Sequence, residues 1–289
     1  MDEPSSKERG LLMNDFRGLL DRLQPGMVAV VGVPYDENSS FMRGAALAPA
    51  RIREVLHAGS SNLCSESGID LGAEPRFLDL GDLELADGAA VLEQIEKAIA
   101  SLLDCDVYVL SLGGDHAITY PILRAYGKKH NRLNILHLDA HPDLYDEFEG
   151  NRYSHACTFA RIMEESSARL VQVGIRTMNP HQRLQAERFG VEVIEMREWQ
   201  PELNVDLEGP LYLSLDMDVL DPAFAPGVSH HEPGGLSTRD VLQLIQSLRV
   251  PIVGADIVEF NPKRDPSGIT AMAAAKFLKE IAAGMLESN

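Results

Sequence analysis

The sequence contains little cysteine and little positive charge, and each shortage excludes a class of protein. Only three cysteines occur, Cys64, Cys105 and Cys157, without CxxC spacing, so neither a disulfide framework nor a thiolate zinc site is indicated. Lys and Arg total 26 against 44 Asp and Glu, for a formal net charge of -18. Such a charge repels phosphate backbones and attracts cations, which argues against nucleic-acid binding.

Long hydrophobic runs are also missing. No uninterrupted apolar stretch approaches the roughly 20 residues that a membrane span needs. The first residues lack the basic start and apolar run of a secretory signal. These absences predict a cytoplasmic protein without membrane partners. Hydrophobic residues still make up 45% of the chain, which is enough for a packed core.

Short apolar runs of strand length alternate with segments of helical spacing, a pattern typical of a parallel sheet covered by helices on both faces. The predicted strands are residues 27–33, 107–112, 133–138, 170–175, 191–194, 211–215 and 252–255. The predicted helices are residues 92–103, 121–129, 158–165, 238–248 and 270–286, with a peripheral helix at 5–23. Without internal repeats or Pro-, Gly- or Ser-rich linkers, we expect an α/β fold: a single three-layer α/β/α domain over residues 1–289 with a central, mostly parallel sheet.

Polar residues directly follow three of the predicted strands, at the edge where open α/β sheets bind ligands. They are Gly113-Gly114-Asp115-His116, Asp139-Ala140-His141-Pro142-Asp143 and Asp216-Met217-Asp218. Residues two apart in extended backbone point to the same side. We therefore expect Asp139, His141 and Asp143 to converge, and Asp216 and Asp218 to do the same.

Any one of these residues alone is best interpreted as a helix cap or a turn residue, but the whole set is not. Four aspartates in a partly buried site repel one another and are costly to desolvate unless cations neutralise them. Two divalent ions balance that charge, and four carboxylates with two imidazoles suit a pair of ions that shares bridging aspartates. The oxygen-rich ligand set favours Mn²⁺, with Zn²⁺ and Ni²⁺ left open.

With these motifs the chain resembles the ureohydrolase family, the arginases and agmatinases, from Val30 to Ala283. The resemblance is carried by SLGGDHAITYP, LHLDAHPDLYD, SLDMDVLDPAFAPG and GADIVEFNP. A likeness to plant-type arginases and related bacterial proteins is carried by NSSFMRGAALAP, FEGNRYSHACTFARIME and GVSHHEPGGLS. The resemblance implies hydrolysis of a small cationic guanidino compound with release of urea, and a homo-oligomer, either a trimer or a hexamer.

The resemblance also implies roles for individual residues. One manganese ion is expected on His116, Asp139, Asp143 and Asp216, and the other on His141, Asp139, Asp216 and Asp218, so that Asp139 and Asp216 bridge the two. His155 is expected to shuttle protons, because an imidazole with an ordinary pKa near roughly 6.5 carries a proton at neutral pH. Glu259 is expected to bind the guanidinium, with further substrate contacts at Asn151 and Asn179.

The substrate itself is left between arginine and agmatine, which differ by the α-carboxylate. The segment Leu144-Tyr145-Asp146-Glu147-Phe148-Glu149 is acidic and lacks the hydroxyls that animal-type arginases use there, so it repels anions. Asn179 replaces the aspartate that animal arginases direct at the α-amino group. Both departures narrowly favour agmatine, with arginine and then other guanidino acids as alternatives.

Two interpretations from other classes are a metal amidohydrolase acting on acetylated amines and a metal-binding scaffold without turnover. The carboxylates for a second metal disfavour the first, and the presence of His155 and Glu259 disfavours the second. Among the remaining candidate residues, His137 inside a strand and Cys157 are assigned packing roles. His230 and His231 are assigned to the rim of the pocket.

Overall fold

The computed structural model describes residues 18–86, 88, 90–201 and 205–287. Eight parallel strands form its sheet, in the order β2-β1-β3-β8-β7-β4-β5-β6. Their bounds are β1 Val28–Gly32, β2 Phe77–Asp82, β3 Tyr108–Leu112, β4 Asn134–Leu138, β5 Arg169–Ile175, β6 Glu192–Glu195, β7 Leu211–Asp216 and β8 Ile252–Val258. The predicted α/β architecture is confirmed, and the mostly parallel sheet is entirely parallel.

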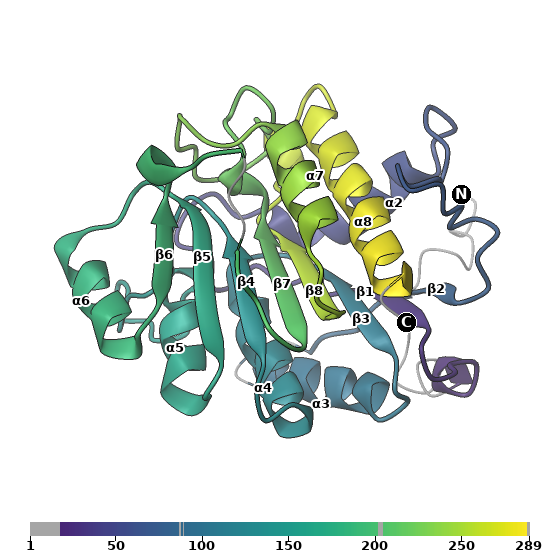
Figure 1. Ribbon diagram of the computed structural model, residues 1–289, viewed down its shortest axis with the longest axis horizontal. Coiled ribbons are helices and arrows are strands. Elements are labelled where there is room, and N and C mark those ends of the chain that lie inside the picture. The colour runs from purple at the N-terminus through teal and green to yellow at the C-terminus, as the bar shows by residue number, and fades with distance from the viewer. Residues whose placement is uncertain (1–17, 87, 89, 202–204, 288–289) are drawn as a thin grey trace, which may run out of the picture.

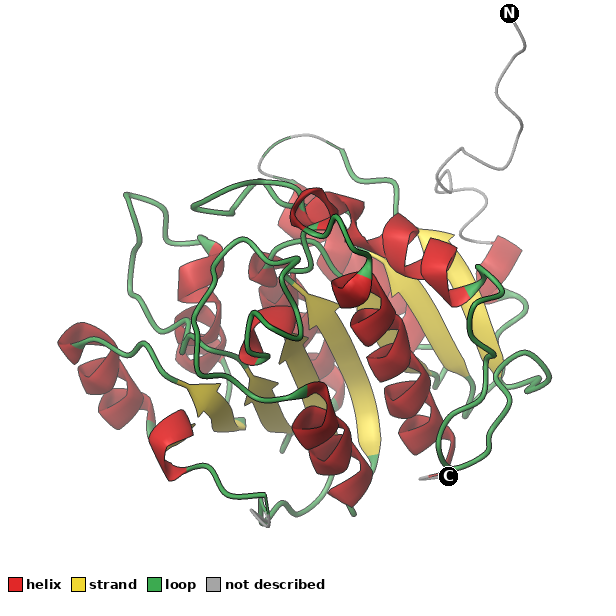
Figure 2. Ribbon diagram, turned by 90° about the horizontal axis from the view of Figure 1, so that it is seen from above, coloured by secondary structure: helices red, strands yellow, loops and turns green. Residues whose placement is uncertain are grey.

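Helices cover both faces of the sheet (Figure 1). One layer contains α2 Ala48–Leu56, α7 Thr238–Ser247 and α8 Ile269–Glu287. The other contains α3 Val91–Leu103, α4 Thr119–Lys129 and α5 Thr158–Glu165, with α6 Pro180–Phe189 packed beside α5. Figure 2 shows the strands between the two helical layers. None of the described helices is long and apolar enough to span a lipid bilayer.

The core lies on both sides of the central strands, which explains their continuous apolar sequence. All five residues of β1 are buried, as are all five of β4 and all six of β7. A strand buried on both faces shows no alternation of polar and apolar residues. The two apolar clusters that result support the four adjacent strands β3, β8, β7 and β4.

Strand β2 and helices α2 and α6 were missed in the prediction. Strand β2 is an edge strand with only one fully buried residue, and Arg53 from α2 pairs with its Asp79 and Asp82. Helix α6 has a weak apolar face, but Asn179 and Gln182 cap its start reciprocally and Gly190 ends it with a φ of 65°. Of the predicted helix at 5–23, residues 5–17 lie outside the described residues, and residues 18–20 are helical.

Candidate metal centre

Four adjacent strands present polar side chains at their carboxyl ends. The predicted site residues lie at or just beyond the ends of β3, β4, β7 and β8: His116, Asp139, His141, Asp143, Asp216, Asp218 and Glu259. Because β3, β8, β7 and β4 are neighbours in a parallel sheet, these ends share one edge.

Aspartate side chains shape the turns that follow the strands. Asp139 Oδ1 accepts from the His141 backbone N–H at 2.5 Å, and Asp216 Oδ1 accepts from the Asp218 backbone N–H at 2.8 Å. Each carboxylate therefore stabilises the turn in its own backbone with one oxygen, and its second oxygen is available to other partners. Asp143 has a φ of 48° and Glu259 a φ of 62°, conformations that cost energy in residues other than glycine and gather at functional sites.

The two nitrogens of the buried His116 imidazole have different partners. Nε2 lies 2.9 Å from Ser214 Oγ, and that hydroxyl donates its only proton to Asp256 Oδ1 at 2.7 Å. Ser214 must therefore accept from Nε2–H, so the neutral ring has its lone pair on Nδ1. Burial acts to lower the pKa of His116, but without an ion the surrounding aspartates raise it well above its ordinary value. Within the described part of the chain Nδ1 has no hydrogen-bond partner.

Three carboxylate oxygens surround this nitrogen. One Oδ2 atom each of Asp139, Asp143 and Asp216 lies 3.2 Å from His116 Nδ1. Neighbouring ligands of an octahedral ion with bonds of about 2.1 to 2.2 Å lie about 3 Å apart. Each of the three oxygens therefore lies at the spacing from His116 Nδ1 that two ligands of one common ion have.

A second group of potential ligands lies beside the first and shares Asp139 with it. His141 Nδ1 lies 3.0 Å from Asp218 Oδ2 and 3.4 Å from Asp139 Oδ1. The ligand atoms of these three residues lie within 4.8 Å of one another. One Asp139 oxygen faces each group, as a bridging carboxylate requires; bridging by Asp216 stays a prediction.

Burial gives these carboxyl groups a strong need for a positive charge. Burial, followed by repulsion from Asp139, raises the pKa of Asp143 to about 6. Burial and the neighbouring Asp218 and Asp139 raise the pKa of Asp216 well above its ordinary value. A cation between these groups removes both penalties. The residues present therefore fit two divalent ions, and their oxygen-rich set suits Mn²⁺ without identifying it.

His155 and Glu259 form a buried pair beside this cluster. His155 Nδ1 lies 2.8 Å from Glu259 Oε1, which also accepts from the His116 backbone N–H at 2.8 Å. On the other side of the ring, the Ser40 backbone N–H donates to Nε2 at 3.2 Å, and Ser40 Oγ lies 2.8 Å from the same nitrogen. Burial acts to lower the pKa of His155, but the Glu259 carboxylate outweighs it and raises the pKa to about 9.

A cavity of about 180 Å³ opens onto the cluster and onto His155 and Glu259. Its lining includes His141, Asp143, Asp216 and Asp218. In the described part of the chain no lysine or arginine lines it. His230 is among the lining residues, with its ring centroid 5.2 Å from that of His155. The cavity therefore joins potential metal ligands to a potential proton carrier.

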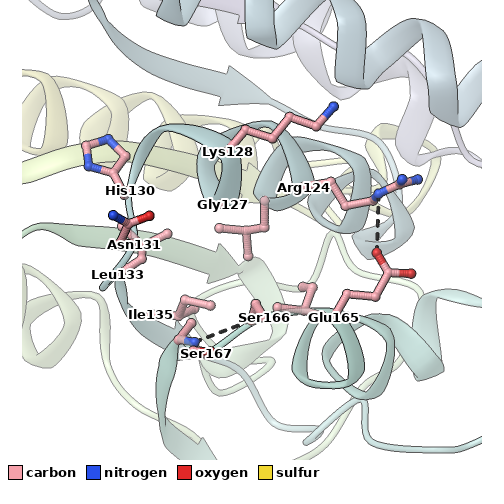
Figure 3. Close-up of a pocket in the computed structure, with 13 residues that line it drawn as sticks. Arg124, Gly127, Lys128, His130, Asn131, Leu133, Ile135, Glu165, Ser166 and Ser167 are labelled. Atoms are coloured by element: carbon pink, nitrogen blue, oxygen red, sulfur yellow. Dashed lines mark hydrogen bonds and ion pairs between the residues drawn. The ribbon is translucent and has the colours of Figure 1, made fainter.

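A larger cavity, of about 420 Å³, lies away from this site between α4 and α5 (Figure 3). Arg124 and Glu165 form an ion pair across its rim, at 3.3 Å. Its lining contains none of the potential metal ligands named above. Size alone therefore does not locate the chemistry.

The polar atoms of Asn151 and Asn179 bond to other protein groups. Asn179 accepts from the Gln182 backbone N–H at 2.9 Å and donates to the Tyr145 hydroxyl at 2.6 Å. Asn151 donates to Asn38 Oδ1 at 3.0 Å and accepts from the Tyr153 backbone N–H at 2.8 Å. Neither is among the residues that line the 180 Å³ cavity, and their substrate contacts stay predictions.

His137 has a larger part in the site than the packing role we expected. Its Nε2 lies 2.7 Å from Asp139 Oδ2, and burial lowers its pKa to about 4, so the ring is neutral. The signal was available in the sequence, because residues two apart in a strand share one side. Ser40, Ser214 and Asp256 were also missed, and only the fold brings them to the cluster.

Comparison with known proteins adds independent findings. A profile described as the Arginase family matches residues 27–284. Arginase 1, mitochondrial, of Arabidopsis thaliana is 48% identical over 93% of this chain and 84% of its own length. The agmatinase of Bacillus cereus is 35% identical over 90% of this chain and 92% of its own length. The structure of the arginase from Medicago truncatula superposes with a TM-score of 0.84 at 41% identity, covering 94% of this chain and 92% of that one.

Proposed function

The chain belongs to the arginase family of guanidino-group hydrolases, and we propose that its substrate is arginine, which it hydrolyses to urea and ornithine. The observation that carries this choice is its higher identity to a plant arginase than to a bacterial agmatinase. Agmatine, which the sequence narrowly favoured, is not supported over arginine by these relatives. It remains the second candidate, because a cavity lined by no lysine or arginine among the described residues also suits a substrate without a carboxylate.

The structure weakens the reasons for preferring agmatine. In the acidic segment 144–149, the Asp146 carboxylate lies 3.2 Å from Arg152 Nη1 and 3.0 Å from Arg161 Nη2, so its charge is paired. The members of this segment that line the cavity are the uncharged Tyr145 and Phe148. The anion repulsion expected from the sequence is therefore reduced at the cavity wall.

The family depends on two metal ions, and we infer that the two groups of ligands hold them. The first ion is proposed on His116, Asp139, Asp143 and Asp216, and the second on His141, Asp139, Asp216 and Asp218. When bound, two such cations neutralise the carboxylates and acidify water to hydroxide, the nucleophile that a delocalised guanidinium requires. Manganese is the proposed metal.

Glu259 is proposed to bind and orient the guanidinium. Its Oε1 is held by His155 and by the His116 backbone N–H, which leaves Oε2 toward a substrate. A carboxylate so held keeps its direction, and a guanidinium donates to it in a charge-assisted bond. Glu259 directly follows β8, so the sheet holds the position of its carboxylate relative to the guanidinium.

His155 is proposed to carry the proton to the leaving amine. Its raised pKa keeps the ring protonated at neutral pH, although bound cations oppose that shift. The Ser40 hydroxyl can accept from Nε2–H when the ring is charged and donate to Nε2 when it is neutral, whereas the Ser40 backbone N–H can donate only to the neutral ring. The ring therefore keeps a partner in both protonation states, as a group that takes up and releases a proton needs.

The substrate is tested by urea release from arginine, agmatine, guanidinobutyrate and guanidine in parallel, with Mn²⁺ supplied. We expect kcat/KM for arginine to exceed that for agmatine by at least about tenfold, a difference of about 1.4 kcal/mol in transition-state binding. An acetylated diamine serves as the control for amide hydrolysis and should not react. Faster turnover of agmatine would transfer the assignment to the second candidate.

Metal binding is expected to stabilise the folded protein and to depend on pH. At a free Mn²⁺ concentration of 100 times Kd, the free energy of unfolding should rise by about 2.7 kcal/mol per site.

The pKa of Asp143 is raised to about 6 in the metal-free fold. Its contribution to the stability of the metal-free protein is therefore fully present at pH values below the ordinary carboxyl pKa and is lost as pH rises through 6. Mn²⁺ affinity should change in the opposite direction and fall as pH drops through 6. Calorimetric melting with and without Mn²⁺ at pH 5 and pH 8 measures both, and an equal metal effect at the two pH values would contradict the assignment of Asp143.

A further inference from the structure

A row of buried polar side chains crosses the sheet just before the metal ligands begin. Gln172 on β5 pairs in register with His137 on β4, His137 with Ser214 on β7, and Ser214 with Asp256 on β8. All four residues are fully buried. We call them the polar row. Buried polar groups in the middle of an apolar sheet are costly unless their hydrogen bonds are made, so the direction of each bond is informative.

One arm of the polar row runs from Gln172 to Asp139. Gln172 Nε2 lies 2.7 Å from Pro142 O, an atom that only accepts, so the amide nitrogen must face it. The same nitrogen lies 2.9 Å from His137 Nδ1, which therefore accepts a proton and carries none. The proton of the neutral ring is then on Nε2 and is donated to Asp139 Oδ2 at 2.7 Å.

The amide orientation carries a cost that the alternative would exceed. Among the described residues Gln172 Oε1 is buried without a hydrogen-bond partner, which costs free energy because the oxygen has lost its hydrating water. Turning the amide over would place Oε1 against the Pro142 carbonyl, acceptor against acceptor. The fold therefore accepts one unpaired oxygen to keep the direction of this arm.

The other arm runs from His116 to Asp256. Ser214 Oγ donates to Asp256 Oδ1 and so accepts from His116 Nε2–H, which directs Nδ1 at the three carboxylates. The second oxygen of Asp256 accepts from the Tyr212 hydroxyl at 2.7 Å and the Thr119 hydroxyl at 2.8 Å. Asp256 is thus the acceptor at which this arm ends.

We propose that the polar row consists of positioning residues for the binuclear site: Ser214 accepts from His116 Nε2–H, so that Nδ1 is the nitrogen directed at the ions, and His137 holds Asp139 with a donated N–H. The proposal rests on the two-cation site of the proposed function, but not on its substrate. Groups that hydrogen-bond to metal ligands fix their orientation and tautomer, and their loss typically lowers metal affinity by about 10- to 100-fold.

His137 is thereby distinguished from a metal ligand. It lies within ligand distance of His116, Asp139 and Asp143, and on geometry alone it could bind an ion. Both of its nitrogens are already engaged, one by Gln172 and one by Asp139. The proposal therefore assigns its ring to the carboxylate and not to the ion.

The first test reads the tautomer directly and needs neither activity nor a variant. In the metal-free protein with ¹⁵N-labelled histidine, nitrogen–proton correlation spectra should show His137 protonated on Nε2 and unprotonated on Nδ1. The His137→Phe variant, which keeps a flat ring against Phe159, assigns the signal by its loss. A proton on Nδ1 of His137 would overturn the proposal.

The second test reverses the other arm with an isosteric change, Asp256→Asn. The Tyr212 and Thr119 hydroxyls favour the amide oxygen, which turns the amide nitrogen toward Ser214 and makes it a donor there. Ser214 then donates to His116 Nε2, so Nε2 must accept and the neutral ring carries its proton on Nδ1. That proton competes with the ion for the Nδ1 lone pair. We expect Mn²⁺ affinity, measured by competition with a chelator, to fall by about 10- to 100-fold.

A matched control removes a bond to Asp256 without reversing the arm. Thr119→Val takes away one donor to Oδ2 and leaves the contact of Oδ1 with Ser214, so Mn²⁺ affinity should stay within about threefold of the original.

For His137→Phe, about two ions per chain should still bind at saturation, only more weakly. A loss of one whole ion from His137→Phe, or unchanged affinity in a folded Asp256→Asn, would refute the polar row as proposed. Because these tests measure metal and protons, a wrong substrate assignment would leave their outcome unaffected.

Discussion

The Asp139→Asn variant is expected to lose both bound metal and turnover, with urea release reduced by at least about 100-fold, the upper end of the loss when only a group that supports a ligand is removed. Asp139 is fully buried, and its two oxygens face different histidines: Oδ2 lies 3.2 Å from His116 Nδ1, and Oδ1 lies 3.4 Å from His141 Nδ1. Asparagine keeps the shape but removes the charge and places an amide N–H toward one of the two groups. One substitution therefore weakens two ion sites.

The measurement is metal content per chain after dialysis against dilute Mn²⁺, beside urea release. Asp146→Asn is the matched control, because Asp146 is a partly exposed carboxylate that pairs with Arg152 and Arg161 and not with the cluster. It should keep about two ions per chain and most of its activity. If Asp139→Asn bound two ions with unchanged affinity, the shared carboxylate would not be part of the centre.

The centre could be predicted from sequence because its information is local. Asp139, His141 and Asp143 alternate directly after an apolar run, as do Asp216 and Asp218, and alternation in extended backbone determines which side chains share a side. The parallel arrangement then brings separate strand ends to one edge. The clustering of these potential metal ligands therefore depends on few contacts between residues far apart in the sequence.

The polar row could not be predicted in this way, because its meaning depends on register between strands. Asp256 shortened the predicted strand to residues 252–255, yet β8 runs on to Val258. An aspartate inside a buried strand contradicts β propensity, and hydroxyls from β7 and α4 satisfy it. Sequence patterns report burial and period, but not the partners that make a buried charge tolerable.

The agmatine expectation failed to gain support for a related reason. Charges in the segment 144–149 were counted as though they faced the substrate. In the fold Asp146 is paired with two arginines, and only uncharged members of the segment line the cavity. The net charge of a sequence segment predicts the electrostatic field around it only when the ion pairs that its residues form are known.

The His155→Ala variant is expected to bind metal normally and to lose about 100- to 10,000-fold in kcat, the range for removal of a general acid or base. The His155 imidazole contacts Glu259 and Ser40. His155 belongs to neither of the two groups of potential metal ligands. Its role is therefore in proton transfer, and KM should change less than kcat. His231→Ala is the matched control, since that exposed histidine contacts the Pro226 carbonyl in the neighbouring loop.

The pH profile separates proton transfer from a structural effect. Glu259 raises the pKa of His155, so a mechanism that needs the protonated ring loses rate as pH rises through that pKa, and this alkaline limb should be absent in His155→Ala. Added imidazole should restore part of the rate, because a small base can enter the space left by the side chain. A variant with full metal content, unchanged kcat and the same alkaline limb would show that another group carries the proton. The next candidate for the proton carrier would be His230, which also lines the cavity and whose ring centroid lies 5.2 Å from that of His155.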